Sequence, residues 1–421
     1  MNIKFDLSQS QADVNDTSDF SSNYSERLQE TLDSREIGFY STLSEERYLS
    51  ASKKVHEKFK SKTNFFHVGI GGSSLGPEML LSALGNTDDV SFEYINNVDP
   101  DVIHESLSKI SDIDDCLFYV VSKSGGTAET IASLIIIINT LRDKFNIDQD
   151  ALQKYIVLCT DENNGDLRKL AADLSLASLI VPTDVGGRFS VLTPVGFLPA
   201  LFAGINCDLL LQSAKEYGRE LLKDGDSDLF KCGQTLSIHL KRNINQTVLM
   251  PYSSKLKNFT SWFVQLWAES LGKKENLNGK VVHTGLTPIS AYGSTDQHSQ
   301  MQLFMDGPRD KAFFLLNVQN FEHDFSLENS FDLASFQLLS NSTMAKLMQA
   351  EYVGAKQAMS ENNLPVISIT IDSVNEKSVG QLIIFFELLT ALMGSVLEVN
   401  PFDQPGVELG KVYTKQILSN G

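Results

Sequence analysis

The sequence predicts an α/β protein with two domains, each built around a mainly parallel sheet flanked by helices. Short apolar runs of strand-like composition alternate with helical patterns from Phe65 onward, and this alternation is typical of βαβ units. It ends near residues 193–196, gives way to a long helical section over residues 199–222, and then begins again. A chain of 421 residues is long enough to form two complete cores.

The predicted elements follow in chain order. The first 40 residues are polar and rich in Ser, Asp and Glu, which indicates a surface arm or short helices. We expect an N-terminal arm with helices over residues 1–55 that packs on the larger domain, a first α/β domain over residues 56–196, and a second, larger domain over residues 197–421 that ends in a helix. The apolar runs predicted as strands are residues 65–68, 92–96, 117–121, 155–159, 179–182, 247–250, 280–283, 312–316 and 366–371.

The composition narrows the classes of function. The net charge is −18, so the chain is a poor candidate for binding nucleic acid or an anionic membrane. Any anionic substrate must be held by local cations and backbone dipoles. The longest apolar stretch, residues 381–399, is nearly long enough to span a membrane, but Glu387 in its middle and Glu398 near its end favour a buried central helix.

Cysteine and histidine usage suggests a protein of a reducing compartment without a metal centre. No basic segment with an apolar core opens the chain, so we expect no signal peptide and a cytoplasmic location. The histidines show no metal-ligand spacing, and we expect no metal and no cofactor. Widely spaced cysteines without a C-x-x-C pair indicate buried thiols. They are Cys116, Cys159, Cys207 and Cys232.

A glycine turn rich in hydroxyls follows the predicted strand at residues 117–121. The segment Ser-Lys-Ser-Gly-Gly-Thr-Ala-Glu-Thr over residues 122–130 leads from that strand into an apolar helix. Backbone N–H groups at such a helix start can bind an anion. Spacing in steps of three predicts that Ser124, Thr127 and Thr130 share a helix face, beside Ser122 and the cation Lys123. We interpret the loop as a phosphate site without the Walker pattern, although Ser, Thr and Gly are also ordinary capping residues.

A second glycine loop follows the predicted strand at residues 65–68. Its glycines would let the backbone approach a ligand, and Ser73 could donate a hydrogen bond to an anion. Gly69, Gly71 and Ser74 match the dinucleotide fingerprint only loosely. One phosphate held from two neighbouring loops therefore fits the pair better than a dinucleotide.

Four further segments carry side chains that suit chemistry, each with a plainer structural alternative. Arg188 follows two glycines at a strand end, where a cation reaches ligand oxygens or pairs with an acid. Gln265 and Glu269 share one helix face, and Glu269 could move a proton or be an ordinary solvated carboxylate. His298 lies among turn residues, where a histidine is usually structural. Lys411 lies on the predicted C-terminal helix and could be a surface lysine.

Together these segments resemble the glucose-6-phosphate isomerase (phosphoglucose isomerase) family, in its compact bacterial type. The similarity runs in the family's order from residue 68 to residue 411 and covers most of the chain. It rests on Gly-Ile-Gly-Gly-Ser73, Ser122-Lys123-Ser124 through Thr130, Gly-Gly-Arg188, Glu269-Ser-Leu-Gly-Lys, Gln-His298, and Asn-Pro-Phe-Asp-Gln404 through Gly-Lys411. The resemblance implies two sugar-isomerase-type α/β domains.

The resemblance also implies an activity and roles for named residues. The activity is the reversible isomerisation of D-glucose 6-phosphate and D-fructose 6-phosphate through a cis-enediol, in glycolysis and gluconeogenesis. Glu269 is implied as the base, Arg188 as the cation that stabilises the intermediate, His298 as the ring-opening acid–base group, and Lys411 as its assistant. The implied substrate contacts are Gly72, Ser73, Ser122, Lys123, Ser124, Thr127, Thr130, Gly187, Gln265 and Gln404.

The family's histidine reaches the site from the partner subunit, so the resemblance implies a homodimer. Two departures stand out: Gly126 replaces the family's usual Thr, and the chain is shorter than the long members, which puts dimer-embracing extensions in doubt. Two alternatives fit less well. A sugar-phosphate-binding regulator should have lost Glu269 or Arg188, and both are present. Bifunctional phosphoglucose/phosphomannose isomerases are typically shorter and lack the full later motifs.

Overall fold

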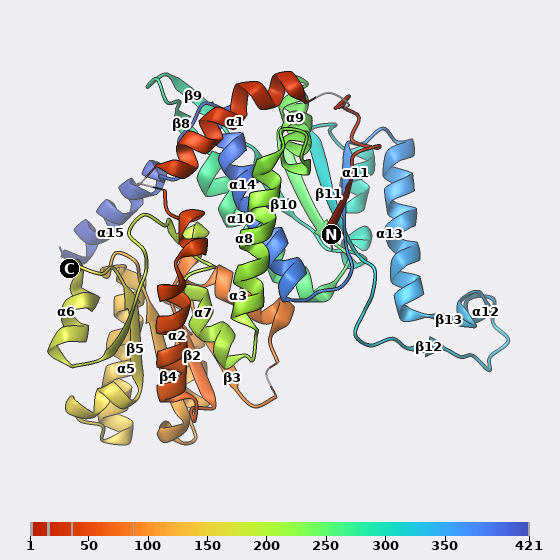
Figure 1. Ribbon diagram of the computed structural model, residues 1–421. Helices are drawn as coiled ribbons and strands as arrows, with labels where there is room; N and C mark the ends of the chain where they lie inside the picture. Colours follow the sequence, from red (N-terminus) through yellow and green to blue (C-terminus); the bar gives the residue numbers. More distant parts are fainter. Residues whose placement is uncertain (1–2, 15–16, 35–36, 87, 420–421) are drawn as a thin grey trace. The chain divides into compact units, whose positions relative to one another are not determined.

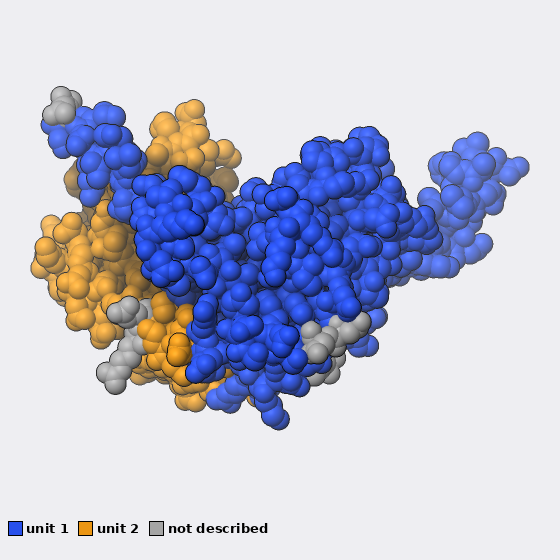
Figure 2. Space-filling model, turned by 90° about the horizontal axis from the view of Figure 1, so that it is seen from above, with its two compact units in different colours: residues 1–29, 216–421 blue, residues 30–215 orange. Residues whose placement is uncertain are grey.

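The computed structural model describes residues 3–14, 17–34, 37–86 and 88–419, and it divides into two compact units (Figures 1 and 2). Unit 1 comprises residues 1–29 and 216–421, and unit 2 comprises residues 30–215. The boundaries fall inside two helices, α1 (Ser18–Asp33) and α8 (Cys207–Lys223). Each unit contains a five-stranded sheet, so the predicted two-part α/β architecture is confirmed.

Unit 2 is built on a fully parallel sheet in the order β3-β2-β4-β5-β6. Counted within the unit this is the doubly wound order 2-1-3-4-5, in which ligands bind outside the carboxyl ends of the first and third strands. Those strands are β2 and β4, and each leads into one of the glycine loops singled out in the sequence. The strands are β2 (Asn64–Val68), β3 (Ser91–Ile95), β4 (Cys116–Val121), β5 (Ile156–Thr160) and β6 (Ala177–Ile180).

Helices cover both faces of this sheet, which is why its strands are continuous apolar runs. Alternate residues of β4 point to opposite faces: Phe118 and Val120 join one cluster, and Leu117, Tyr119 and Val121 join the other. The first cluster packs under α4 (Pro100–Ser108), α5 (Ala128–Phe145) and α6 (Asp166–Asp173), and the second under α2 (Glu46–Phe59) and α7 (Pro194–Phe202). Helix α3 (Leu75–Leu84) also belongs to this unit.

Unit 1 is also built on a mainly parallel five-stranded sheet, but one of its edge strands is antiparallel. Its sheet has the order β1-β14-β11-β7-β10, in which only β1 runs antiparallel to its neighbour. The strands are β1 (Ile3–Asp6), β7 (Gln246–Pro251), β10 (Thr287–Ser290), β11 (Lys311–Val318) and β14 (Val366–Ile371). The helices are α9 (Asp228–Lys241), α10 (Lys257–Leu271), α11 (Met301–Asp306), α12 (Ala334–Leu339), α13 (Met344–Glu361), α14 (Glu376–Val396) and α15 (Glu408–Ser419).

Helix α14 is the apolar stretch that approached membrane-spanning length in the sequence. It passes the length and hydropathy test for a span, but 89% of its apolar window is buried inside the protein. Glu387 lies within this core, and burial raises the pKa of its carboxyl group well above the usual range. The prediction of a buried central helix is confirmed, and so is the burial of all four cysteines as free thiols.

The strand predicted at residues 280–283 is present as β9 (Val281–Thr284), but it does not join the main sheet of unit 1. It pairs in an antiparallel hairpin with β8 (Lys273–Glu275) and stays exposed, and β10 joins the main sheet instead. The polar N-terminal segment contains a helix, α1, which is one of the two predicted forms. It also contains the strand β1, which was not predicted and which pairs with β14. Because β1 and β10 carry polar residues at outward-facing positions, neither strand appears in the sequence as a continuous apolar run.

The compact units also differ from the domain boundaries predicted at residues 55 and 196. Residues 30–55 and 197–215 group with the first α/β domain, because α2 packs on α7 across both predicted boundaries. Residues 1–29 group with the second domain, because β1 belongs to its sheet.

An arm leaves the body of unit 1 between β11 and α13. It contains β12 (Ser326–Leu327), α12 and β13 (Ser342–Thr343), and Figure 1 shows it extending away from its own unit's sheet. Its large apolar side chains are exposed, among them Phe325 at 70% and Leu338 at 84%.

Candidate functional site

Three hydroxyl groups meet in the loop that leaves β4. The hydroxyl of Thr127 lies 2.8 Å from that of Ser122 and 3.4 Å from that of Ser124. Thr127 is the N-cap residue of α5, yet its side chain caps no backbone N–H. The hydroxyls therefore gather at a helix start where N–H groups lack intrahelical acceptors, which is an anion-binding arrangement.

The prediction that Ser124, Thr127 and Thr130 share a helix face was wrong, because only one of the three lies on the helix. Helix α5 begins at Ala128, so Ser124 and Thr127 precede it and only Thr130 lies on its first turn, where it is buried. The turn of the loop depends instead on Gly125, which has a φ of +64°. A Cβ atom added at this position would lie 3.1 Å from the Cα of Gly165. Gly126 has open space at its Cβ position, so nothing in its surroundings requires glycine.

Lys123 lies beside the hydroxyl cluster. Its ammonium donates to the backbone carbonyl oxygen of Thr183 at 2.7 Å. Burial lowers the pKa of Lys123, and the carboxylates of Asp184 and Asp161 oppose this effect. The bond to Thr183 ties the β4 loop to the chain that follows β6.

The other two glycine motifs of unit 2 lie side by side. A Cβ atom on Gly72 would lie only 2.2 Å from the backbone carbon of Gly187, so only glycine permits this approach. Ser73 ends the short 3-10 turn η2 (Gly71–Ser73), and Arg188 lies in η5 (Gly187–Phe189) with its side chain buried. The structure therefore brings Gly72, Ser73, Gly187 and Arg188 together at the end of β2.

His67 supports this junction, although the sequence interpretation gave it no role. It is buried in β2 and its Nε2 donates to the carbonyl oxygen of Ser73 at 2.6 Å. Burial lowers the pKa of His67 to about 4, while the bond to Ser73 opposes the change, so the ring is neutral at pH 7. A histidine at the end of a buried strand, beside a glycine loop, was the available signal.

In unit 1, Gln265 and Glu269 lie one turn apart on α10, as predicted. The side-chain amide of Gln265 donates to Oε2 of Glu269 at 3.1 Å. Both side chains are half-buried on a helix of which Trp262, Phe263, Leu266 and Trp267 are buried in the core. A fixed helix and an amide donor thus orient the carboxylate.

The remaining predicted residues of unit 1 lie on separate elements. Gln404 precedes the turn η8 (Pro405–Val407) and is exposed. Lys411 is exposed on α15, where its ammonium pairs with Glu408 at 2.8 Å. His298 ends η7 (Thr295–His298) and is exposed at the edge of a cavity of about 530 Å³ formed with α11 and α13.

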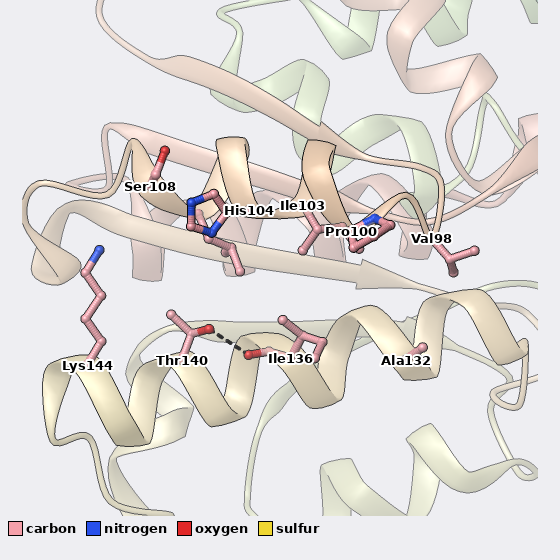
Figure 3. Close-up of a pocket in the computed structure, with 10 residues that line it drawn as sticks. Val98, Pro100, Ile103, His104, Ser108, Ala132, Ile136, Thr140 and Lys144 are labelled. Carbon is pink, nitrogen blue, oxygen red and sulfur yellow. Dashed lines mark hydrogen bonds between the residues drawn. The ribbon is translucent and has the colours of Figure 1, made fainter.

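An apolar groove of unit 2 lies between α4 and α5 (Figure 3). Its walls include Val98, Ile103, Leu107 and Ile136, with Lys144 at one end, and none of its lining residues is a predicted site residue. Within the described ranges, no group of three or more His, Cys, Asp or Glu side chains is placed to hold a metal ion.

Comparisons with known proteins show the family of the chain and its fold. A family model described as phosphoglucose isomerase matches residues 43–421. A glucose-6-phosphate isomerase of Carboxydothermus hydrogenoformans is 37% identical over 412 residues, covering 93% of this chain and 87% of the relative. A structure titled as a hypothetical protein of Thermus thermophilus superposes with a TM-score of 0.92 at 34% identity and 99% coverage of both chains. A glucose-6-phosphate isomerase structure from Chlamydia trachomatis, with a TM-score of 0.85, 22% identity and coverage of 99% of this chain and 88% of its own, shares the fold.

Proposed function

Because the chain belongs to the phosphoglucose isomerase family, we propose that it interconverts D-glucose 6-phosphate and D-fructose 6-phosphate. The observation that carries the proposal is the cluster of Ser122, Ser124 and Thr127 at the carboxyl end of β4. It offers hydroxyls, helix N–H groups and the ammonium of Lys123 to a dianionic phosphate, in a chain whose net charge of −18 would otherwise repel one.

Glu269 is proposed to move the proton between C2 and C1. An aldose and a ketose differ by one proton position and one carbonyl position, so a single base that takes and returns the proton suffices, through a cis-enediol. The hydrogen bond from Gln265 supports this role, since it fixes the orientation of the carboxylate. Binding energy from a phosphate remote from C1 and C2 can be used to position the reacting carbons for proton transfer.

Arg188 is proposed to stabilise negative charge on the intermediate. Its guanidinium stays protonated at all physiological pH values and lies in a water-poor environment, where its electrostatic effect is strong. Gly72 and Gly187, whose backbones approach closely at this point, and Ser73 are proposed to line the sugar site.

His298 and Lys411 are proposed to open the sugar ring, with Gln404 as a substrate contact. His298 is exposed in the single chain, which suits a residue that acts in the site of a partner subunit. The exposed apolar arm gives a second reason to propose a homodimer, since such surfaces mark protein contacts. The buried free cysteines support the cytoplasmic location proposed for the enzyme.

A coupled assay of the purified protein with fructose 6-phosphate tests the function. We expect production of glucose 6-phosphate, unchanged by EDTA, because proton transfer with charge stabilisation requires no metal. Activity abolished by EDTA and restored by a divalent ion would contradict the metal-free mechanism. Absence of isomerisation in both directions would contradict the function itself.

A further inference from the structure

Lys273 is a buried lysine immediately beyond the helix that carries Glu269. It opens β8, and only 7% of the residue is exposed. A lysine is rarely buried this far unless its charge is compensated, so its surroundings need an explanation.

Backbone carbonyl groups contribute to this compensation. The ammonium donates to the carbonyl oxygens of Glu269 at 2.8 Å, Ser270 at 2.9 Å and Asp403 at 3.0 Å. The first two belong to the last turn of α10, where carbonyls lack intrahelical partners and the helix dipole favours a cation. The carboxylate of Asp403 is farther away, with Oδ1 at 3.6 Å.

These bonds join two segments that are distant in the sequence. One is the turn that carries Glu269, and the other is the loop at residue 403, directly before Gln404. The three N–H donors of an ammonium match the three carbonyls, so one side chain fixes both backbones.

We propose that Lys273 is a positioning residue for the isomerisation, which holds the Glu269 carboxylate and the backbone before Gln404 in the geometry that the proton transfer requires. This inference rests on the proposed function. Lys273 is assigned a positioning role because its ammonium bonds to the backbone carbonyls of the two segments that it joins. A base misplaced by about 1 Å lowers turnover much more than binding.

The structure supplies a direct test, because Lys273 also lines a cavity of about 570 Å³ together with Asn400 and Asp403. Truncation in Lys273→Ala removes three methylene groups and the ammonium beside this space. n-Propylammonium has that same composition and can enter from the cavity. Tetramethylammonium carries the same charge without an N–H donor and is the matched additive control. Lys274→Ala, at the neighbouring exposed lysine, is the matched variant control.

We expect Lys273→Ala to lower kcat about 10²-fold, with the KM and the affinity for a sugar-phosphate inhibitor changed by less than about threefold. n-Propylammonium should restore part of the kcat, and tetramethylammonium should not. The proposal is overturned if Lys273→Ala keeps kcat within about twofold of the native enzyme. It is also overturned if kcat is lost and the propylammonium has no effect. Should Lys273→Ala not fold, Lys273→Gln, which keeps an N–H donor without the charge, is judged by the same kcat and KM criteria.

Hydrogen exchange separates this inference from the proposed function. The amide of Gly272 bonds to the carbonyl oxygen of Ala268 in the last turn of α10. We expect faster exchange in that turn in Lys273→Ala and slower exchange again with n-propylammonium, whether or not the native protein isomerises sugar phosphates. A native protein without isomerase activity would therefore contradict the proposed function, whereas unchanged exchange would overturn the role of Lys273.

Discussion

The ammonium of Lys123 lies 2.7 Å from the backbone carbonyl oxygen of Thr183 and donates a hydrogen bond to it. The bond holds the only cation of the Ser122–Thr130 segment beside the hydroxyls of Ser122, Ser124 and Thr127. A charge fixed in advance loses little side-chain entropy when a phosphate binds. The same burial that fixes the ammonium also lowers its pKa.

Lys123 should therefore give substrate binding a characteristic pH dependence. Since its pKa lies below the ordinary lysine value, its charge is lost at a lower pH than that of a free lysine. We expect the KM for fructose 6-phosphate to rise at alkaline pH, beginning below the pH at which an ordinary lysine loses its charge, and to rise less in Lys123→Arg, whose guanidinium stays charged. Steady-state kinetics across the alkaline range measure it. Equal pH dependence of the KM in both proteins would show that Lys123 does not bind the phosphate. Unchanged inhibitor affinity in the double variant Lys123→Ala/Ser124→Ala would show the same.

The two adjacent glycines of the same loop should respond oppositely to alanine. Gly126 has open space at its Cβ position and lies outside the left-handed region, so Gly126→Ala should raise the free energy of unfolding by about 0.4–1 kcal/mol through the unfolded chain's entropy. Gly125 has a φ of +64° and an added Cβ would lie 3.1 Å from the Cα of Gly165, so Gly125→Ala should lower it by more than that gain. Denaturant unfolding of both variants is the measurement. Equal effects at the two positions would show that the loop backbone differs from this description.

Glu269→Gln should abolish the proton shuttle and preserve phosphate binding. General acid–base groups contribute about 10²–10⁴-fold, and a sole shuttle should lie at or above the upper end of that range. The measurement pairs kcat with the affinity for a sugar-phosphate inhibitor. Glu275→Gln, at an exposed glutamate of β8, is the matched control and should keep native activity. Retention of more than about a tenth of kcat in Glu269→Gln would place the base elsewhere.

The ion pair between Asp6 on the edge strand β1 and Lys356 should make part of the protein's stability depend on pH. Partial burial would raise the pKa of its carboxyl group, but hydrogen bonds from Lys356 on α13 and from Ser8 outweigh this and lower it to about 2. A carboxylate with a depressed folded-state pKa stabilises the fold above its unfolded value of 3.8, and this contribution disappears as the pH falls through about 2. Because the side chain is 47% exposed, we expect Asp6→Asn to cost only about 1 kcal/mol at pH 7.

Denaturant unfolding of native protein and Asp6→Asn at pH 7 and near pH 2 measures this difference. The gap between the two proteins should narrow at the lower pH. A gap of the same size at both pH values would mean that the ion pair with Lys356 is not its cause.

The contrast between well-predicted and missed elements has a physical origin. Strands such as β4 are buried on both faces, so their sequence is a continuous apolar run that is visible without the fold. Strand β1 has four residues with exposed and half-buried positions, and β10 contains Thr, Pro and Ser, so neither shows such a run. The exposed arm was not foreseen, because its apolar residues look like core positions in a sequence.

Some features of the candidate site can likewise be predicted from the sequence, and others cannot. The loops that bear Ser73, Ser122 and Arg188 combine glycines and hydroxyls within a few residues, and local patterns reveal them. The contacts of Lys123 with Thr183 and of Lys273 with Asp403 join residues 60 and 130 positions apart. Such contacts depend on sheet order and helix packing. Lys273 in particular looks like any basic residue after a helix until its three carbonyl partners are seen.

The final prediction concerns the exposed His298. If it acts in the partner subunit's site, mixing inactive Glu269→Gln and His298→Ala proteins under subunit exchange should restore activity. In each mixed dimer one site carries both lesions and the other carries neither. Random pairing makes about half of the dimers mixed, so about a quarter of native sites should return, as two-fold symmetry requires. Native mass spectrometry confirms exchange, and each variant mixed with itself is the control. Confirmed exchange without recovered activity would mean that His298 acts within its own subunit or has no part in the reaction.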